Sequence, residues 1–143
     1  MATCDAAGAM DVGEDMIIAG IGCRRQADAM EVKAAIETAM RALLCAHQKL
    51  NVIATPAAKS TSTAVFAAAQ ALGVGVMLIS QPALEEASPR TFTRSARSLA
   101  EMNVHSVSEA AALAGAGTCS RLLGPRIVLG PVTCALAESD SAA

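Results

Sequence analysis

Short apolar runs and helical patterns alternate along this chain, and no other feature constrains its fold as strongly. Apolar runs typical of strands occupy 16–22, 51–55, 75–80, 126–130 and 132–138, and helical patterns occupy 28–47, 60–73, 83–87 and 106–117. Gly130-Pro131 joins the last two runs, and such a short turn requires antiparallel pairing. We therefore expect one three-layer α/β domain with a mixed, mostly parallel sheet of about five strands.

Two of the expected helices begin with the same capping signature. Asp28 is followed three residues later by Glu31, and Ser106 is followed three residues later by Glu109. In a capping box of this kind, each side chain accepts a hydrogen bond from the backbone amide of the other residue. We expect both helices to begin with such a box, and we expect Gly73 to end the helix before it in a left-handed conformation.

The composition argues against several classes of partner. The chain of 143 residues contains two Phe and neither Trp nor Tyr, so it offers little surface on which bases could stack. Its formal net charge is −2, and it has no long basic run. No apolar run approaches the roughly 20 residues that a membrane-spanning helix needs. We expect neither nucleic acid nor a membrane as a partner.

The two ends of the chain lack periodicity and differ from the middle. We expect a flexible leader at 1–14, a folded domain at 15–138 and a flexible tail at 139–143. The leader has no basic segment ahead of an apolar core, so we expect no secretory signal and a cytoplasmic location. The five cysteines include no CxxC pair, and with only two histidines they predict reduced thiols and no metal site.

The sequence GIGCRRQ at 20–26 places two positive charges directly after the first apolar run. Arg24 and Arg25 can each hold a carboxylate through two parallel hydrogen bonds, and α/β folds bind ligands at the carboxyl ends of their strands. Gly20 and Gly22 predict a tight turn that a ligand can approach closely. A solvated loop is the alternative. Because Arg25 stands where a dinucleotide motif has its third glycine, we expect no such cofactor, and no other cofactor is indicated.

A second polar segment follows the second predicted strand. Lys59, Ser60, Thr61 and Ser62 lie between that strand and a helix, and they reach the same sheet edge as Arg24 if the two strands are parallel. Backbone amides, hydroxyls and a lysine can together hold a carboxylate. Ordinary helix capping beside a solvated lysine is the alternative.

Three residues are candidates for catalysis, and each has a structural alternative. Cys23 can gain nucleophilicity from the neighbouring arginines, or it can be a packed thiol. Glu109 can act as an acid or base, whereas its capping position favours a structural role. His105 can titrate near neutrality or face solvent. Ser106 is a candidate ligand-binding residue at the same helix start, and Thr133 lies near the ligand if the direction of the last strand allows it.

Four motifs occur in an order that resembles a known family. GIGCRR follows the first strand, AT and then a lysine follow the second, SVSEAAAL opens a late helix, and VTCALA lies near the end. Together they resemble the CobE family, which is also found as the C-terminal domain of the cobalamin-biosynthesis protein CbiG, over roughly 16–138. Two segments depart from the family pattern: Gln26-Ala27 replace Gly-Thr, and 60–63 replace a small-acidic-Pro-Gly stretch.

The resemblance implies a role in building the corrin ring of vitamin B12. In the fused form, the whole protein opens a lactone on the macrocycle and releases a two-carbon fragment as acetaldehyde. For this chain, the resemblance implies binding of a carboxylate-rich tetrapyrrole, a precorrin or corrinoid intermediate, as a carrier or accessory factor. The alternatives are a hydrolase or lyase that acts on a precorrin lactone, and a subunit that contacts only other cobalamin-biosynthesis enzymes. The sequence decides neither between these roles nor whether the chain forms a homodimer.

Overall fold

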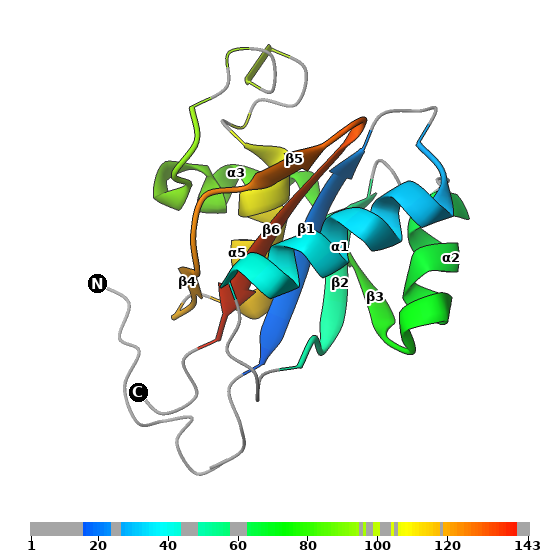
Figure 1. The fold of residues 1–143 in the computed structure, drawn as a ribbon. Coiled ribbons are helices and arrows are strands. Elements are labelled where there is room, and N and C mark those ends of the chain that lie inside the picture. The colour runs from blue at the N-terminus through cyan, green and yellow to red at the C-terminus, as the bar shows by residue number, and fades with distance from the viewer. Residues whose placement is uncertain are drawn as a thin grey trace, which may run out of the picture.

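The computed structural model describes most of the chain between Met16 and Ser139. The described residues are 16–23, 27–43, 49–57, 63–94, 96, 99–100, 104, 106–117 and 119–139. The named elements are β1 (Ile17–Cys23), α1 (Ala29–Leu43), β2 (Val52–Pro56), α2 (Thr63–Leu72), β3 (Gly75–Ile79), α3 (Gln81–Ala87), the 3-10 helix η3 (Ser88–Arg90), α5 (Val107–Ala116), β4 (Arg121–Leu122), β5 (Ile127–Leu129) and β6 (Val132–Glu138). Strands and helices alternate from β1 to α3, as the sequence predicts (Figure 1).

One mixed sheet forms the middle of the molecule (Figure 1). Its strand order is β3-β2-β1-β6-β4, and β5 also pairs with β6. β1, β2 and β3 are parallel, whereas β6 runs antiparallel to β1, β4 and β5. The three parallel strands end at Cys23, Pro56 and Ile79, and we name this side of the sheet the carboxyl edge. The expected mixed sheet is confirmed. The described chain has six strands and not five, since the sequence did not predict β4, whose two residues give no periodic signal.

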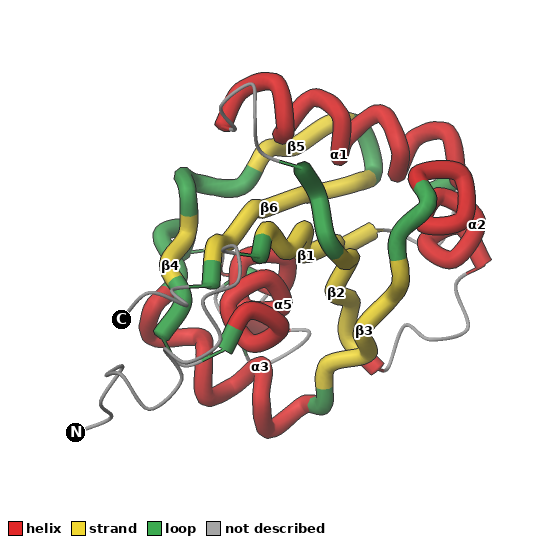
Figure 2. Tube along the Cα trace, turned by 90° about the horizontal axis from the view of Figure 1, so that it is seen from below, coloured by secondary structure: helices red, strands yellow, loops and turns green. Residues whose placement is uncertain are grey.

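Helices cover both faces of the sheet, which confirms the three-layer architecture (Figure 2). α1 and α2 pack on one face, and α3 and α5 pack on the other. Successive side chains of a strand point to opposite faces, so Ile17 and Ile21 of β1 join the α1 layer while Ile18 joins the α5 layer. Because β1 is buried on both faces, its sequence is a continuous apolar run rather than an alternating one.

The glycines of β1 serve helix packing and not a turn. Gly20 and Gly22 lie inside the strand and pair with residues of β6, so the predicted tight turn at these positions is wrong. A β-carbon on Gly20 would collide with the carbonyl oxygen of Ser108 and the amide nitrogen of Ala112. The missing side chain therefore lets the backbone of α5 approach the backbone of β1 directly. The periodicity of the α5 sequence could not reveal this close approach, because periodicity shows which residues are apolar and not how near the helix lies to the strand.

The start of α1 shows the predicted capping box. The amide of Glu31 donates to Oδ1 of Asp28 over 2.8 Å, and the amide of Asp28 donates to Oε1 of Glu31 over 3.0 Å. Val32 and Ile36 of this helix are fully buried against the sheet. Gly73 follows α2 with a φ of 74°, which confirms the predicted left-handed stop.

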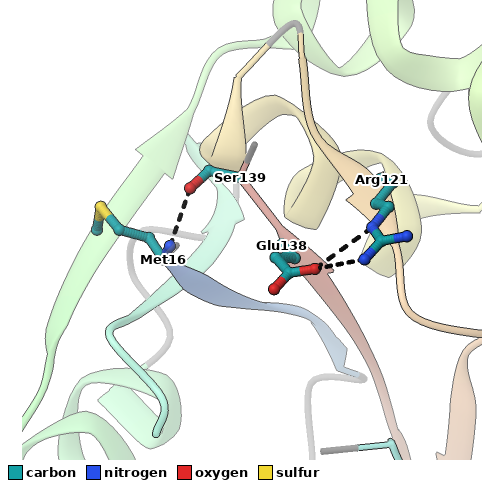
Figure 3. Close-up of polar contacts among 4 residues, drawn as sticks. All are labelled: Met16, Arg121, Glu138 and Ser139. Atoms are coloured by element: carbon teal, nitrogen blue, oxygen red, sulfur yellow. Dashed lines mark hydrogen bonds and ion pairs between the residues drawn. The ribbon is translucent and has the colours of Figure 1, made fainter. Parts of the chain in front are cut away.

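Polar contacts join the first and last strands at the edge opposite to the carboxyl edge (Figure 3). The amide of Met16 donates to Oγ of Ser139, and the amide of Ser139 donates to the carbonyl of Met16, each over 2.9 Å. Arg121 of β4 donates to Oε1 of Glu138 from Nε at 3.3 Å and from Nη2 at 2.9 Å. Because β4 has two residues, this bidentate contact adds to a ladder that is otherwise short.

Some predictions fall beyond what the structure describes. The predicted leader at 1–14, residues 140–143 of the predicted tail and residues 44–47 of the first predicted helix are outside the described residues. Among the helices that are described, none combines the length and apolarity needed to cross a membrane.

Candidate functional site

Three chain segments meet at the carboxyl edge around the end of β1. A β-carbon on Gly22 would lie 2.9 Å from Oγ1 of Thr133, 3.8 Å from the amide nitrogen of Ser108 and 3.8 Å from Cβ of Val107. The end of β1, the start of β6 and the first turn of α5 are therefore in direct contact. The positive end of the α5 dipole points to this edge, where ligands of α/β folds bind.

Two threonines hold the last residues of β1 from its two neighbouring strands. Thr133 of β6 pairs with Gly22, and its hydroxyl donates to the carbonyl of Gly22 over 3.2 Å. Thr55 of β2 donates in the same way to the carbonyl of Ile21 over 3.4 Å. The antiparallel direction of β6 thus brings Thr133 to the carboxyl edge, a point that the sequence left open. Thr55 belongs to the AT motif that supports the family resemblance, but sequence reasoning assigned it no role at the site.

Most of the predicted charged and hydroxyl residues fall in segments beyond this description. Outside the described residues are Arg24, Arg25, Lys59, Ser60, Thr61, Ser62 and His105. The strands that precede the first two segments are described, and Cys23 and Pro56 end them. Because β1 and β2 are adjacent and parallel, both segments begin at the carboxyl edge. Contact of these side chains with one another or with a ligand stays a prediction.

The described cysteines differ in state. Cys23 is a free, half-buried thiol at the end of β1, opposite Val132 of β6. Cys134 is also free, and burial raises the pKa of its thiol to about 12, which keeps it protonated near neutrality. Cys119 is disulfide-bonded, so the prediction of reduced thiols is wrong at this position. Within the described residues, no three His, Cys, Asp or Glu side chains gather closely enough to hold a metal ion.

Glu109 does not close the predicted capping box at the start of α5. Its Oε1 accepts hydrogen bonds from the amides of Phe92 and Thr93, and its Oε2 accepts from Oγ1 of Thr93 and the amide of Arg126, all over 2.8 Å. The side chain is fully buried. One carboxylate therefore fastens two separate segments to the first turn of α5. A catalytic role for Glu109 stays a prediction, and these contacts favour a structural one.

Ser106, the other residue of the predicted capping box, does not cap α5 with its side chain. Ser106 is the N-cap residue of α5, but its side chain makes no capping hydrogen bond, so the predicted box is wrong on both sides. Ser106 and Ser108 are fully buried, and among the described residues neither hydroxyl has a hydrogen-bond partner. Sequence reasoning noted both serines but named only Ser106 as a candidate ligand-binding residue, because a lone serine within an apolar helix start is a weak signal.

Two described arginines lie on the segments that Glu109 holds. Arg94 directly follows Thr93, is exposed, and donates from Nη2 to the carbonyl of Pro89 over 3.5 Å. Arg126 is half-buried, and its own amide is one of the donors to Glu109. Sequence reasoning missed Arg126, since it reads as the first residue of a strand. The structure thus places cationic residues on both segments that Glu109 fastens to α5.

Residues 17–137 match the family model described as Cobalamin synthesis G C-terminus. The chain belongs to this family. Protein CobE of Sinorhizobium sp. is 34% identical over 121 residues, which cover 85% of this chain and 79% of that protein. The resemblance to the CobE family is therefore confirmed, and the chain is a protein of the cobalamin biosynthesis pathway.

Solved structures of related proteins share the fold. The crystal structure of CobE, described as a protein from the cobalamin (vitamin B12) biosynthetic pathway, has a TM-score of 0.80 at 31% identity and covers 87% of this chain and 90% of its own. Cobalamin biosynthesis protein chiG from Agrobacterium tumefaciens str. C58 gives 0.68 at 38% identity over 85% and 97%. A cobalamin biosynthesis protein G homolog from Sulfolobus solfataricus gives 0.60 at 21% identity over 87% and 37%, a likeness that shows the fold alone.

Proposed function

We propose that this protein binds a carboxylate-rich tetrapyrrole or corrinoid intermediate of cobalamin biosynthesis, as a carrier or accessory factor in the cytoplasm. One observation carries the proposal: the strands that lead into the Arg24-Arg25 segment and the Lys59 segment are adjacent and parallel, and the N-terminus of α5 lies beside them. Three sources of positive potential are thus attached to one edge of the sheet.

The chemistry of the ligand supports this choice. Precursors of the corrin ring carry several acetate and propionate side chains, and both guanidinium groups and helix N-termini favour a carboxylate over a neutral amide. Phe92, whose amide is bonded to the buried Glu109, is 56% exposed. It offers an apolar face to a macrocycle on a segment that is fastened to the start of α5.

A binding role agrees better with the described residues than catalysis does. Both oxygens of Glu109 already accept hydrogen bonds from the protein, and the Cys134 thiol stays protonated near neutrality. The alternative, a hydrolase or lyase that acts on a precorrin lactone, is favoured by one observation, the free thiol of Cys23 at the carboxyl edge. Turnover of such a lactone that disappears in Cys23→Ser would select the enzyme. A carrier would hand its ligand to other cobalamin-biosynthesis enzymes, which are therefore its proposed partners.

Calorimetric titration with a corrin polyacid tests the binding role. Cobyrinic acid, whose side chains end in free carboxylates, should bind. The same molecule with its side-chain carboxylates converted to amides should bind at least tenfold more weakly, since charge-assisted hydrogen bonds are worth about 1.5–3 kcal/mol each. The double variant Arg24→Ala/Arg25→Ala should lose a large part of the affinity for the acid that amidation removes from the wild type.

A charge-matched variant separates specific contacts from net charge. Arg41 at the end of α1 and Lys49 just before β2 are exposed and lie away from the carboxyl edge. Arg41→Ala/Lys49→Ala removes the same formal charge as the arginine pair and should leave the affinity within about twofold. Equal affinity for the acid and the amide, or equal losses in the two double variants, would refute the carboxylate clamp.

A further inference from the structure

We infer that the first turn of α5 is a receptor for a single carboxylate, built from the hydroxyls of Ser106 and Ser108 and the backbone amides of the turn. This inference rests on the proposed function, because the carboxylate would be the tip of one acetate or propionate arm of the macrocycle. It assigns a specific place to that arm, in addition to the contacts proposed for the Arg24-Arg25 and Lys59 segments.

The capping signature of α5 does not satisfy the start of this helix. The first amides of any helix have no acceptor inside the helix, and an N-cap side chain usually supplies one. At α5 the N-cap Ser106 does not, and Glu109, the other residue of the signature, turns its oxygens to Phe92, Thr93 and Arg126 instead. Neither side chain of the signature therefore accepts a hydrogen bond from the amides of this turn.

Two buried serine hydroxyls lie at the same helix end. The hydroxyls of Ser106 and Ser108 are buried completely and have no hydrogen-bond partner among the described residues. A buried hydroxyl without a partner is costly, and such groups in native proteins call for an explanation such as a bound molecule. The two hydroxyls lie two residues apart at one helix end, where a bound acceptor would supply their missing hydrogen bonds.

The donor set lies beside the end of β1 and is uncharged. The amide of Ser108 would be 3.8 Å from a β-carbon on Gly22, so the turn lies against the end of β1, directly before the Arg24-Arg25 segment. The set consists of hydroxyls and amides that carry no formal charge, which suits one monovalent carboxylate. Both hydroxyls are below the surface, so the receptor requires the tip of a slender arm, and not the ring itself, to enter between β1 and α5.

Serine variants give the test a signature that a structural role would not produce. Ser106→Ala and Ser108→Ala remove hydroxyls without partners, so the melting temperature of the free protein should stay the same or rise. Affinity for cobyrinic acid should nevertheless fall about tenfold, as expected for loss of hydrogen bonds to a charged group. Ser120→Ala is the matched control: its hydroxyl donates to the carbonyl of Leu113 near the other end of α5, so this variant should lower the melting temperature and leave the affinity unchanged.

A titration with propionate, followed by amide NMR, separates this inference from the proposed function. Shifts at Val107, Ser108 and Glu109 that vanish in the double variant Ser106→Ala/Ser108→Ala support the receptor even if cobyrinic acid fails to bind. If the wild type and the double variant bind cobyrinic acid equally, the receptor is refuted while the proposed function stands. A long-lived water that binds both hydroxyls and that propionate does not displace would also refute the receptor. So would shifts of these amides that persist in the double variant and are equally large with inorganic phosphate and with propionate.

Discussion

The helices α1 and α5 begin with the same sequence signature and end up with opposite arrangements. At α1, Asp28 and Glu31 satisfy each other in the solvent-exposed first turn. At α5, the Ser106 side chain makes no capping hydrogen bond, and Glu109 accepts hydrogen bonds from two other segments of the chain. The signature therefore locates a helix start reliably, but the partners of its side chains depend on whether that start is exposed or buried.

The two helices also approach the sheet differently. α1 packs through side chains, with Val32 and Ile36 against the isoleucines of β1. α5 comes so close to β1 that its backbone occupies the space of a side chain at Gly20. One helix is thus fastened mainly by apolar burial and its own cap, and the other by a glycine contact and a buried carboxylate. Three substitutions, each with a counterpart elsewhere in the chain, can break this contrast.

Loss of the Glu109 carboxylate should have the largest effect. In Glu109→Ala, three backbone amides and one hydroxyl lose their shared acceptor, and buried donors without partners cost about 1–3 kcal/mol each. We expect a loss of about 4 kcal/mol in the free energy of unfolding, measured by urea denaturation. Glu31→Ala removes one exposed capping contact and should cost about 1 kcal/mol or less.

Glu109→Gln keeps the shape of the side chain and guards against a variant that does not fold. Its amide nitrogen cannot accept the pair of hydrogen bonds that one carboxylate oxygen receives, so its loss should lie between those of Glu109→Ala and Glu31→Ala. If Glu109→Ala and Glu31→Ala prove equally mild, the two helix starts do not differ as we argue.

A methyl group at Gly20 should have the next largest effect. Gly20→Ala forces the α5 backbone away from β1, and we expect a loss of about 3 kcal/mol, at the upper end of the range for overpacked cores. Gly75→Ala in β3 is the counterpart, since the nearest atom to its β-carbon would be a methyl group of Val52 at 3.9 Å. That variant should be neutral or slightly stabilising by thermal unfolding. Equal behaviour of the two variants would show that α5 does not need the close approach.

The contrast between the helices also explains how far the sequence could predict the molecule. Periodicity predicted the strands, the helices and the three layers, because each of these depends on which faces are apolar, and the short turn at Gly130-Pro131 predicted the mixed sheet. Sequence reasoning placed Gly20 in a turn, since a glycine that admits a neighbouring backbone looks the same in sequence as one that bends the chain. The two-residue β4 was missed because it is too short to show any period.

The candidate site was predictable only in part for a related reason. Motif order led to the family, and the parallel pairing of β1 and β2 agrees with the expected position of the two polar segments. The partners of Glu109 lie 16 and 17 residues away along the chain, and no local pattern encodes contacts at that distance. Ser108 became visible only through its burial and its lack of a partner, two properties that tertiary structure alone defines.

The smallest expected effect is the most direct comparison of the two helix starts. Asp28→Ala removes a side chain that accepts a hydrogen bond from the amide of Glu31, and the loss of such a cap costs about 1 kcal/mol. Ser106→Ala makes the same kind of truncation at the corresponding position of α5, but the hydroxyl it removes has no partner among the described residues. Its free energy of unfolding should therefore stay within about 0.3 kcal/mol of the wild type or increase. Chemical denaturation of both variants in one buffer measures the difference. A loss of 1 kcal/mol in Ser106→Ala would mean that this serine caps α5 after all, and both helices would then begin in the same way.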